Sequence, residues 1–185
     1  MNSRLLTDKI KAEATRLGFF ACGIAKAGPV NDKMVRQLKA WLESGNYAGM
    51  EYMTNYTDKR TDPRLLMPGL KSIVSVALNY APRQNLDENE YQLAAYALGK
   101  DYHDIVKDKL RQLANSIGAV DCLHESSEND APDTNDNPIR CRIFVDSGPV
   151  LERYWAEQAG LGWIGRNHQL IIPYAGSMFF LGELF

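Results

Sequence analysis

Asp146 is the residue of this sequence whose surroundings best suit acid–base chemistry. It ends the predicted strand over 139–146, and it precedes the turn Ser147-Gly148-Pro149 and a predicted helix that ends at Ala159. Open α/β sheets gather their ligands at such strand ends. A carboxyl group that donates a proton at neutral pH needs a pocket that excludes water. An aspartate that only caps a helix or makes a turn has the same local sequence, so both interpretations stay open.

Tyr102 and His103 are candidates for lining a pocket. The run Asp101-Tyr102-His103 resembles the start of the D-x-H-x-x-G motif of corrinoid mutases, in which the histidine binds cobalt, but Val106 stands where that motif has glycine. In the alternative interpretation, Asp101 caps the helix that follows and His103 is exposed or hydrogen-bonded.

A group of hydrogen-bond donors surrounds the turn after the helix that ends at Ala159. Arg153 and the run Arg166-Asn167-His168 suit phosphates or the amide side groups of a large cofactor. The same residues are equally ordinary on a protein surface.

The run Gly160-Leu161-Gly162-Trp163-Ile164-Gly165 matches the dinucleotide fingerprint G-x-G-x-x-G letter for letter. That fingerprint binds a pyrophosphate only when a strand precedes it and a helix follows it. Here a helix precedes and a strand follows, so the pattern does not favour a dinucleotide. We expect instead a tight helix-to-strand turn pressed close to a flat ligand.

The three cysteines, Cys22, Cys122 and Cys141, are widely spaced, and each lies in a predicted strand. This favours reduced thiols in the core. The sequence has no C-x-x-C motif and no cluster of cysteine and histidine, so we expect the chain by itself to hold neither zinc nor an iron–sulfur cluster.

The composition is that of a globular protein of one ordinary domain. The chain has 185 residues, of which 45% are hydrophobic and 24% charged, with a net charge of -2. The acidic balance argues mildly against nucleic-acid binding. A local basic patch could reconcile RNA binding with that balance; its candidate members are Lys59, Arg60, Arg64, Lys100, Arg140 and Arg142. No export signal opens the chain and no apolar run approaches the roughly 20 residues of a membrane helix, so we expect a cytoplasmic protein with no membrane partner.

Alternating strands and helices must position these residues. The patterns predict helices over 3–17, 32–44, 104–117 and 147–159, and strands over 19–25, 71–80, 119–124, 139–146, 169–172 and 177–184. Residues 49–60 are expected to be irregular, and 125–137 form a solvated acidic loop. The prediction is a layered α+β or α/β domain, with a mixed sheet flanked by helices. Because the chain stops inside the apolar run 178–185, we expect it to be cut from a longer protein.

Several segments resemble the N-terminal domain of epoxyqueuosine reductases. The most specific are Val145-Asp146-Ser147-Gly148-Pro149-Val150-Leu151-Glu152-Arg153 and Ala159-Gly160-Leu161-Gly162-Trp163-Ile164-Gly165-Arg166-Asn167. The runs 58–64, 68–74 and 96–103 add to them, so the resemblance extends over essentially the whole chain.

The resemblance implies a nitroreductase-like domain over 1–185 that binds cobalamin and reduces epoxyqueuosine in tRNA to queuosine by two electrons. It implies Asp146 as the proton donor, no cobalt-ligating histidine, and a contact of Arg153 with tRNA. The residues that it places at cobalamin are Arg60, Ala94, Asn167, His168, Gln169 and Leu170. Family members continue into a ferredoxin-like domain with two 4Fe-4S clusters, which receive electrons from an external donor. We expect this chain, as a monomer, to bind the cofactor but to lack its electron supply.

Two other functions fit the same residues. One is a corrinoid-binding module without catalysis, such as a carrier. The other is a flavin-dependent reductase, because a layered fold of the nitroreductase type can hold either flat cofactor.

Overall fold

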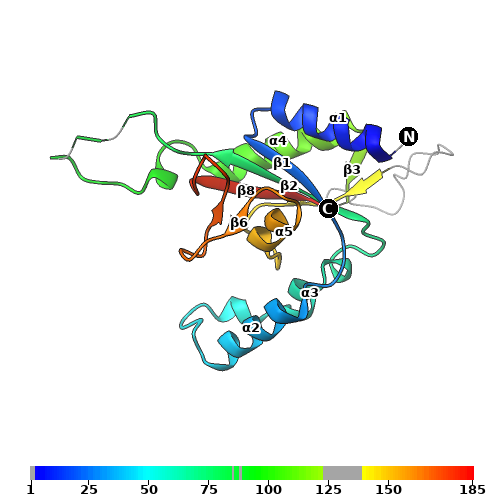
Figure 1. Ribbon diagram of the computed structural model, residues 1–185, viewed down its shortest axis with the longest axis horizontal. Coiled ribbons are helices and arrows are strands. Elements are labelled where there is room, and N and C mark those ends of the chain that lie inside the picture. Colours follow the sequence, from blue (N-terminus) through cyan, green and yellow to red (C-terminus); the bar gives the residue numbers. More distant parts are fainter. Residues whose placement is uncertain (1–2, 85, 88, 123–138) are drawn as a thin grey trace.

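The computed structural model describes residues 3–84, 86–87, 89–122 and 139–185, and its centre is a four-stranded sheet (Figure 1). The strands lie in the order β1 (Ala21–Lys26), β2 (Ser72–Asn79), β8 (Phe179–Leu184) and β5 (Ile143–Phe144). Every neighbouring pair in this sheet is antiparallel. The central strand predicted over 71–80 is confirmed, because β2 has a partner on each edge and residues 73–77 are all buried.

Helices cover both faces of this sheet (Figure 1). On one face lie α1 (Ser3–Arg16) and α4 (Tyr102–Ser116), whose buried side chains share one hydrophobic cluster with β2. On the other face, α5 (Glu152–Gln158) packs against β1, β2 and β8. The α+β class with a sheet flanked by helices is thereby confirmed.

Two smaller strand pairs complete the sheet structure of the described residues. The pair β3 (Ala119–Asp121) and β4 (Ile139–Cys141) is parallel. The predicted mixture of parallel and antiparallel strands is therefore found across the sheets and not within the four-stranded sheet. The pair β6 (Trp163–Ile164) and β7 (Leu170–Ile171) is antiparallel. The sequence patterns did not predict β6, since a two-residue strand is too short to show a period.

The single strand predicted over 139–146 is a wrong prediction. Its residues divide between β4 and β5, which belong to different sheets. The break lies at Arg142, whose backbone N–H and C=O both pair with Phe185 while its side chain donates to the carbonyl of Leu66 at 2.6 Å. The local sequence pattern does not show where a long-range contact divides one predicted strand between two sheets.

A separate lobe at the bottom of Figure 1 contains α2 (Asp32–Glu43) and the short helices η1 (Glu51–Thr54), α3 (Thr57–Thr61) and η2 (Pro63–Leu65). The Asn31 side chain caps α2 by accepting from the Met34 N–H at 2.9 Å. The predicted apolar face of α2 is only half-buried, and no residue of α2 is fully buried. Residues 49–60 were expected to be irregular, and this is corrected: local backbone hydrogen bonds turn much of the segment into η1 and α3.

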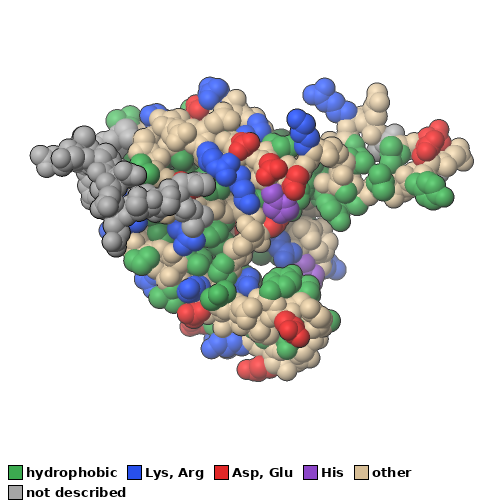
Figure 2. All heavy atoms as spheres, turned by 180° about the vertical axis from the view of Figure 1, so that it is seen from behind, with side chains coloured by type: hydrophobic (Ala, Val, Ile, Leu, Met, Phe, Trp, Pro, Cys, Tyr) green, Lys and Arg blue, Asp and Glu red, His purple; other side chains and the backbone are tan. Residues whose placement is uncertain are grey.

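The described residues between 80 and 101 leave the sheet as an extended arm that includes η3 (Ala95–Ala97). Its large apolar side chains are exposed, Tyr91 to 94%. Figure 2 shows hydrophobic side chains along this arm, at the right of the view, and acidic and basic side chains interspersed over the rest of that face. Of the candidate basic patch, Arg64 pairs with Asp62 at 2.6 Å and Arg142 is engaged inside the fold.

The described cysteines are all free thiols, with Cys22 in β1, Cys141 in β4 and Cys122 just after β3. Burial raises the pKa of the Cys22 thiol to about 11, as expected for a protonated thiol in an apolar environment. None of the described helices is both long enough and apolar enough to cross a membrane. The acidic run expected to be a solvated loop lies outside the described residues.

Candidate active site around Asp146

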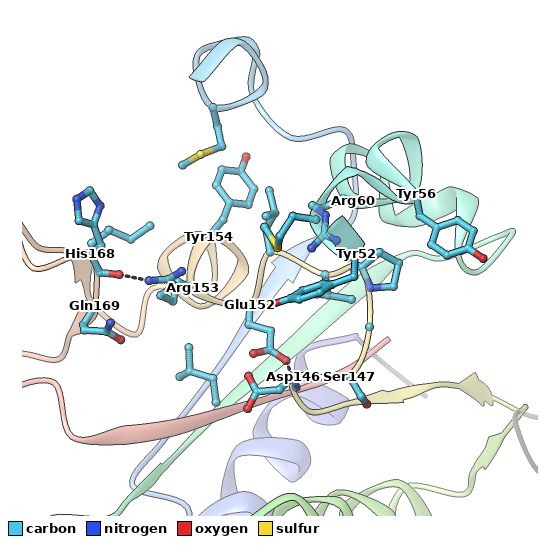
Figure 3. Close-up of a pocket in the computed structure, with 18 of the residues that line it drawn as sticks. Tyr52, Tyr56, Arg60, Asp146, Ser147, Glu152, Arg153, Tyr154, His168 and Gln169 are labelled. Carbon is cyan, nitrogen blue, oxygen red and sulfur yellow. Dashed lines mark hydrogen bonds between the residues drawn. The ribbon is translucent and has the colours of Figure 1, made fainter. Parts of the chain in front are cut away.

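A cavity of about 1020 Å³ opens between the loop after β5, the first turn of α5, the lobe and β8 (Figure 3). Of the residues predicted for a site, five line it: Arg60, Asp146, Arg153, His168 and Gln169. The fold therefore brings together residues that lie more than 100 positions apart in the sequence.

Asp146 lies at the edge of this cavity, and three neighbours fix its position. The hydroxyl of Tyr102 donates to Oδ2. His103 Nε2 lies 3.7 Å from the same oxygen. The Asp146 backbone N–H donates to Glu152 Oε1 at 2.6 Å. The side chain of Asp146 is 50% exposed, so a ligand can reach its carboxyl group.

The reason given for Asp146 from the sequence needs correction. It was placed at a strand end of an open α/β sheet, whereas β5 lies in an antiparallel sheet. Asp146 still follows a buried strand directly, and its φ of 53° is in the left-handed region, which aspartate tolerates better than most residues. The backbone itself turns here, and this turn carries the carboxylate to the cavity.

Tyr102 and His103 are positioned by the start of α4. Asp101 caps this helix by accepting from the His103 N–H at 2.8 Å, and the same oxygen lies 2.8 Å from His103 Nδ1. The Tyr102 ring stacks on Phe180 of β8, with centroids 3.9 Å apart and planes 1° apart. The capping interpretation is thus confirmed, and Tyr102 and His103 contact Asp146 from outside the cavity lining. Burial, and then the hydrogen bond to Asp146, raise the pKa of Tyr102 far above its usual range.

Two glutamates of the site were missed by the sequence analysis. Glu152 opens α5 and lines the cavity, and Glu183 of β8 has no exposed surface. Removal from water, and then the charge of Asp146, raise the pKa of Glu152 to about 8. Burial, and then the charge of Glu152, raise the pKa of Glu183 well above its ordinary value. One signal was available: Glu183 is the only acidic residue in the apolar run 178–185.

Arg60 enters the cavity from α3 and is only 9% exposed. Its Nε has no hydrogen-bond partner among the described residues. Burial lowers the pKa of its guanidinium group. A buried cation with an unpartnered N–H is costly without a ligand, so Arg60 is the residue of the wall best suited to bind an anionic or carbonyl oxygen.

The opposite wall comes from α5 and the segment after β6. Arg153 Nη1 donates to the carbonyl of His168, as the dashed line in Figure 3 shows. Gln169 lies beside them, and its backbone N–H donates to the Asn167 side chain at 3.2 Å. Asn167 therefore shapes this segment without lining the cavity itself.

Besides Asn167, two residues that the resemblance placed at the cofactor, Ala94 and Leu170, do not line the cavity. Ala94 is exposed on the arm. Leu170 is 3% exposed and belongs to a hydrophobic cluster under α5.

Two glycines of the G-x-G-x-x-G run, Gly162 and Gly165, lie against the protein's own chain, whereas the expected contact of the run with a flat ligand stays a prediction. Gly160 has a φ of 80° and ends α5. A Cβ on Gly162 would lie 2.0 Å from the Ile171 carbonyl oxygen, and one on Gly165 would lie 2.4 Å from the Ile171 side chain. These glycines thus permit β6 and β7 to approach closely. Among the described residues, no group of three or more His, Cys, Asp or Glu side chains could hold a metal ion.

Comparisons of the sequence and of the fold with known proteins agree on one family. Residues 60–147 match the family model "Epoxyqueuosine reductase QueG, DUF1730". The chain is 44% identical over 180 residues to the epoxyqueuosine reductase of Cyclobacterium marinum, covering 96% of this chain and 53% of that protein. It is 38% identical over 187 residues to that of Pseudomonas aeruginosa, covering 97% of this chain and 47% of that protein. A crystal structure of a selenomethionine-labelled epoxyqueuosine reductase matches with a TM-score of 0.80 at 28% identity, over 99% of this chain and 46% of that one.

By sequence and by fold, the chain is similar to the epoxyqueuosine reductases. It spans about half the length of the curated relatives it matches. Two further epoxyqueuosine reductase structures bear on the site. One, with a TM-score of 0.79, was solved with an epoxyqueuosine-modified stem loop of tyrosine tRNA. The other, from Bacillus subtilis with a TM-score of 0.73, is described with a catalytic loop, named for an aspartate, swung out of the active site.

Proposed function

We propose that the cavity beside Asp146 is the active site of a cobalamin-dependent epoxyqueuosine reductase, in which Asp146 protonates the epoxide oxygen of a substrate carried by tRNA. The observation that carries this proposal is the carboxyl of Asp146, held at the edge of a large cavity by Tyr102 and Glu152. The relative solved with a modified tRNA stem loop supports the substrate. The relative whose catalytic loop is named for an aspartate supports the role of the loop after β5.

The cavity fits a large, flat cofactor. Its volume of about 1020 Å³ reaches the upper end of ordinary ligand pockets, roughly 300–1,000 Å³. Met53, Phe179 and Leu181 give it apolar walls, and the buried Arg60 supplies an unpartnered N–H. We assign Arg60 and Gln169 to the polar side groups of the corrin, with the apolar walls facing the ring.

The residues of this chain hold and deliver the proton, while cobalamin, when bound, supplies the reducing electrons. Tyr102 donates to Oδ2 and so fixes the orientation of the Asp146 carboxyl. A general acid must lie within hydrogen-bond reach of the oxygen that it protonates, and the half-exposed Asp146 carboxyl meets this requirement for a ligand in the cavity.

Arg153 suits a contact with the phosphate backbone of the tRNA. It uses one N–H group to bind the carbonyl of His168 and lies at the exposed rim. Its other N–H groups can bind a phosphate oxygen, and arginine is well suited to such contacts because its donors are planar and always charged.

The remaining features come from the resemblance alone and complete the proposal. Electrons reach the site from two 4Fe-4S clusters in a domain outside residues 1–185, fed by an external donor. The protein works in the cytoplasm as a monomer.

A visible-absorption titration with cob(II)alamin, run beside one with FMN, tests the cofactor. We expect a saturable change with cobalamin and none with FMN; saturable binding of FMN alone would replace this proposal with a flavin-dependent reductase. A second measurement gives cobalamin and a chemical reductant to the protein together with an epoxyqueuosine stem loop, and follows loss of one oxygen by mass spectrometry.

The variant Asp146→Asn separates catalysis from a carrier role. We expect it to bind cobalamin normally and to lose about 100-fold or more in single-turnover rate, the usual contribution of a general acid. The matched control is Asp108→Asn, which alters an exposed aspartate of α4 that pairs with Arg111. Equal rates for the two variants would remove Asp146 from the chemistry.

A further inference from the structure

The side chain of Glu152 binds the loop that carries Asp146. The Asp146 backbone has a left-handed φ of 53°, a conformation that non-glycine residues keep only when neighbouring contacts hold them there. That contact is the hydrogen bond of 2.6 Å from the Asp146 N–H to Glu152 Oε1. Figure 3 shows the Glu152 carboxyl pointing down from α5 toward Asp146. The position of Asp146 therefore depends on the side chain of Glu152.

Glu183 lies behind Glu152, in the core. In the sheet it is opposite Phe144 on one side and Ser75 on the other, and both Glu183 and Ser75 have no exposed surface. Neither oxygen of the Glu183 carboxyl has a hydrogen-bond partner among the described residues, and the Ser75 hydroxyl also lacks one. Glu152 is the nearby acid whose charge adds to burial in raising the pKa of Glu183.

A fully buried carboxyl group without a hydrogen-bond donor is costly in its ionised form, and both conditions hold for Glu183. The ion pairs among the described residues include no Lys or Arg partner for either glutamate. The pair therefore keeps at least one proton at neutral pH. It keeps that proton next to Asp146, whose backbone N–H donates to Glu152 Oε1 at 2.6 Å.

The chemistry of the proposed function needs such a store of protons. Two-electron reduction of an epoxide takes up two protons, whether the product is an alkene with water or an alcohol. One carboxyl group gives one proton and is then a carboxylate. Within one turnover, Asp146 must therefore receive a proton again or another group must donate the second.

We propose that Glu152 and Glu183 form a buried proton reserve that holds Asp146 in place and returns a proton to it after each transfer to the substrate. This inference rests on the proposed function. The Asp146 O–H protonates the oxygen as the C–O bond breaks, and the proton held by the glutamate pair then passes through Glu152 to the Asp146 carboxylate. Water in the cavity reloads the pair, since Glu152 lines that cavity. Both glutamates act through Asp146 and are positioning residues.

Other charged or titratable groups also lie around Asp146 and the two glutamates. Tyr102 and His103 contact Asp146 from α4, and Arg60 shares the cavity from α3. The variants below leave all of them unchanged, so they serve as a constant background for the pH measurements.

Infrared spectroscopy of the protein without cofactor tests the reserve independently of activity. We expect the C=O band of a protonated carboxylic acid at pH 7 in the unmodified chain, and a weaker band in Glu183→Gln and in Glu152→Gln. Both variants keep the shape of the side chain, and the Gln amide can still bond the other glutamate. The matched control is Glu157→Gln, because Glu157 lies on the same helix and accepts from the Ile164 N–H at 3.0 Å. A band absent from the unmodified chain, or equally strong in Glu183→Gln, would overturn the inference.

Turnover by the cobalamin-loaded protein with a chemical reductant gives the second readout. We expect Glu152→Gln and Glu183→Gln to lower kcat by about 10-fold or more with KM unchanged, and to remove the fall in kcat on the alkaline side. Glu152→Ala also loses the acceptor for the Asp146 N–H and should be slower than Glu152→Gln. Rates equal to that of Glu157→Gln would reject the reserve. Failure of cobalamin to bind any variant or the unmodified chain would reject the proposed function and leave the infrared result standing.

Discussion

Tyr102 donates its hydroxyl to Oδ2 of Asp146, although 44 residues separate the two in the sequence. The bond joins the first turn of α4 to the loop after β5, and thus links the two faces of the sheet at its edge. Because Tyr102 also stacks on Phe180 of the central sheet, the orientation of Asp146 is tied to the most rigid part of the fold.

Removing this hydroxyl should affect Asp146 and little else. The variant Tyr102→Phe keeps the ring stack but loses the donor, and we expect a loss of about 1 kcal/mol in the free energy of unfolding. We expect a roughly 10-fold lower single-turnover rate with unchanged cobalamin affinity. The control is Tyr96→Phe, at an exposed tyrosine of the arm. If both variants react at the same rate, the hydroxyl does not orient Asp146.

The half-buried Glu152 and the fully buried Glu183 should make the protein less stable as the pH rises. The pKa of Glu152 is raised from its ordinary value of 4.5 to about 8, so between these values the folded chain holds a proton that the unfolded chain releases. The free energy of unfolding therefore falls as pH rises through this window. Glu183 acts in the same direction. We expect the Tm to drop by several degrees between about pH 5 and 8.

The variant Glu183→Gln removes one of these two groups. Its Tm should therefore change less over the same pH range than that of the unmodified chain. The lowered pKa values of Asp62 and Asp101 have the opposite sign and act at more acidic pH. Parallel Tm curves for the variant and the unmodified chain would show that Glu183 carries no extra proton in the folded state.

Gly162 should tolerate no side chain. A Cβ there would lie 2.0 Å from the Ile171 carbonyl oxygen, which belongs to the backbone of β7 and cannot move aside. We expect Gly162→Ala to cost about 2 kcal/mol or more in urea unfolding. Gly28→Ala is the control, because a Cβ at Gly28 meets nothing within 4 Å. Equal stability of the two variants would contradict the close approach of β6 and β7.

Arg60 should matter more for binding than for stability. Its guanidinium is buried with an unpartnered Nε, so replacing it by an apolar side chain removes a desolvation cost. We expect Arg60→Met to unfold at an equal or higher urea concentration and to bind cobalamin about 10-fold more weakly. Lys59→Met, which alters a neighbour stacked on Tyr56, is the control. Unchanged cobalamin affinity in Arg60→Met would exclude Arg60 from the site.

The sequence by itself determined the local elements and several of their ends. The stripe Val106, Leu110 and Leu113 predicted α4, and Asp101 was recognised as a possible cap, because helical spacing and capping depend on residues three or four positions apart. Asp146 could be chosen as a candidate for the same reason, since a strand, an acid and a Gly-Pro turn follow one another directly.

Only the tertiary structure decided which polar groups meet and which remain in water. Glu152 and Glu183 come together because β8 pairs with β5 and α5 packs against β8, and no local pattern encodes that register. The same packing buries Leu170 and leaves Ala94 on an exposed arm. A side chain's charge, hydrogen bonds and pKa depend on neighbours distant in the chain, so the proton chemistry of this site appears only when the sheet and its helices are assembled.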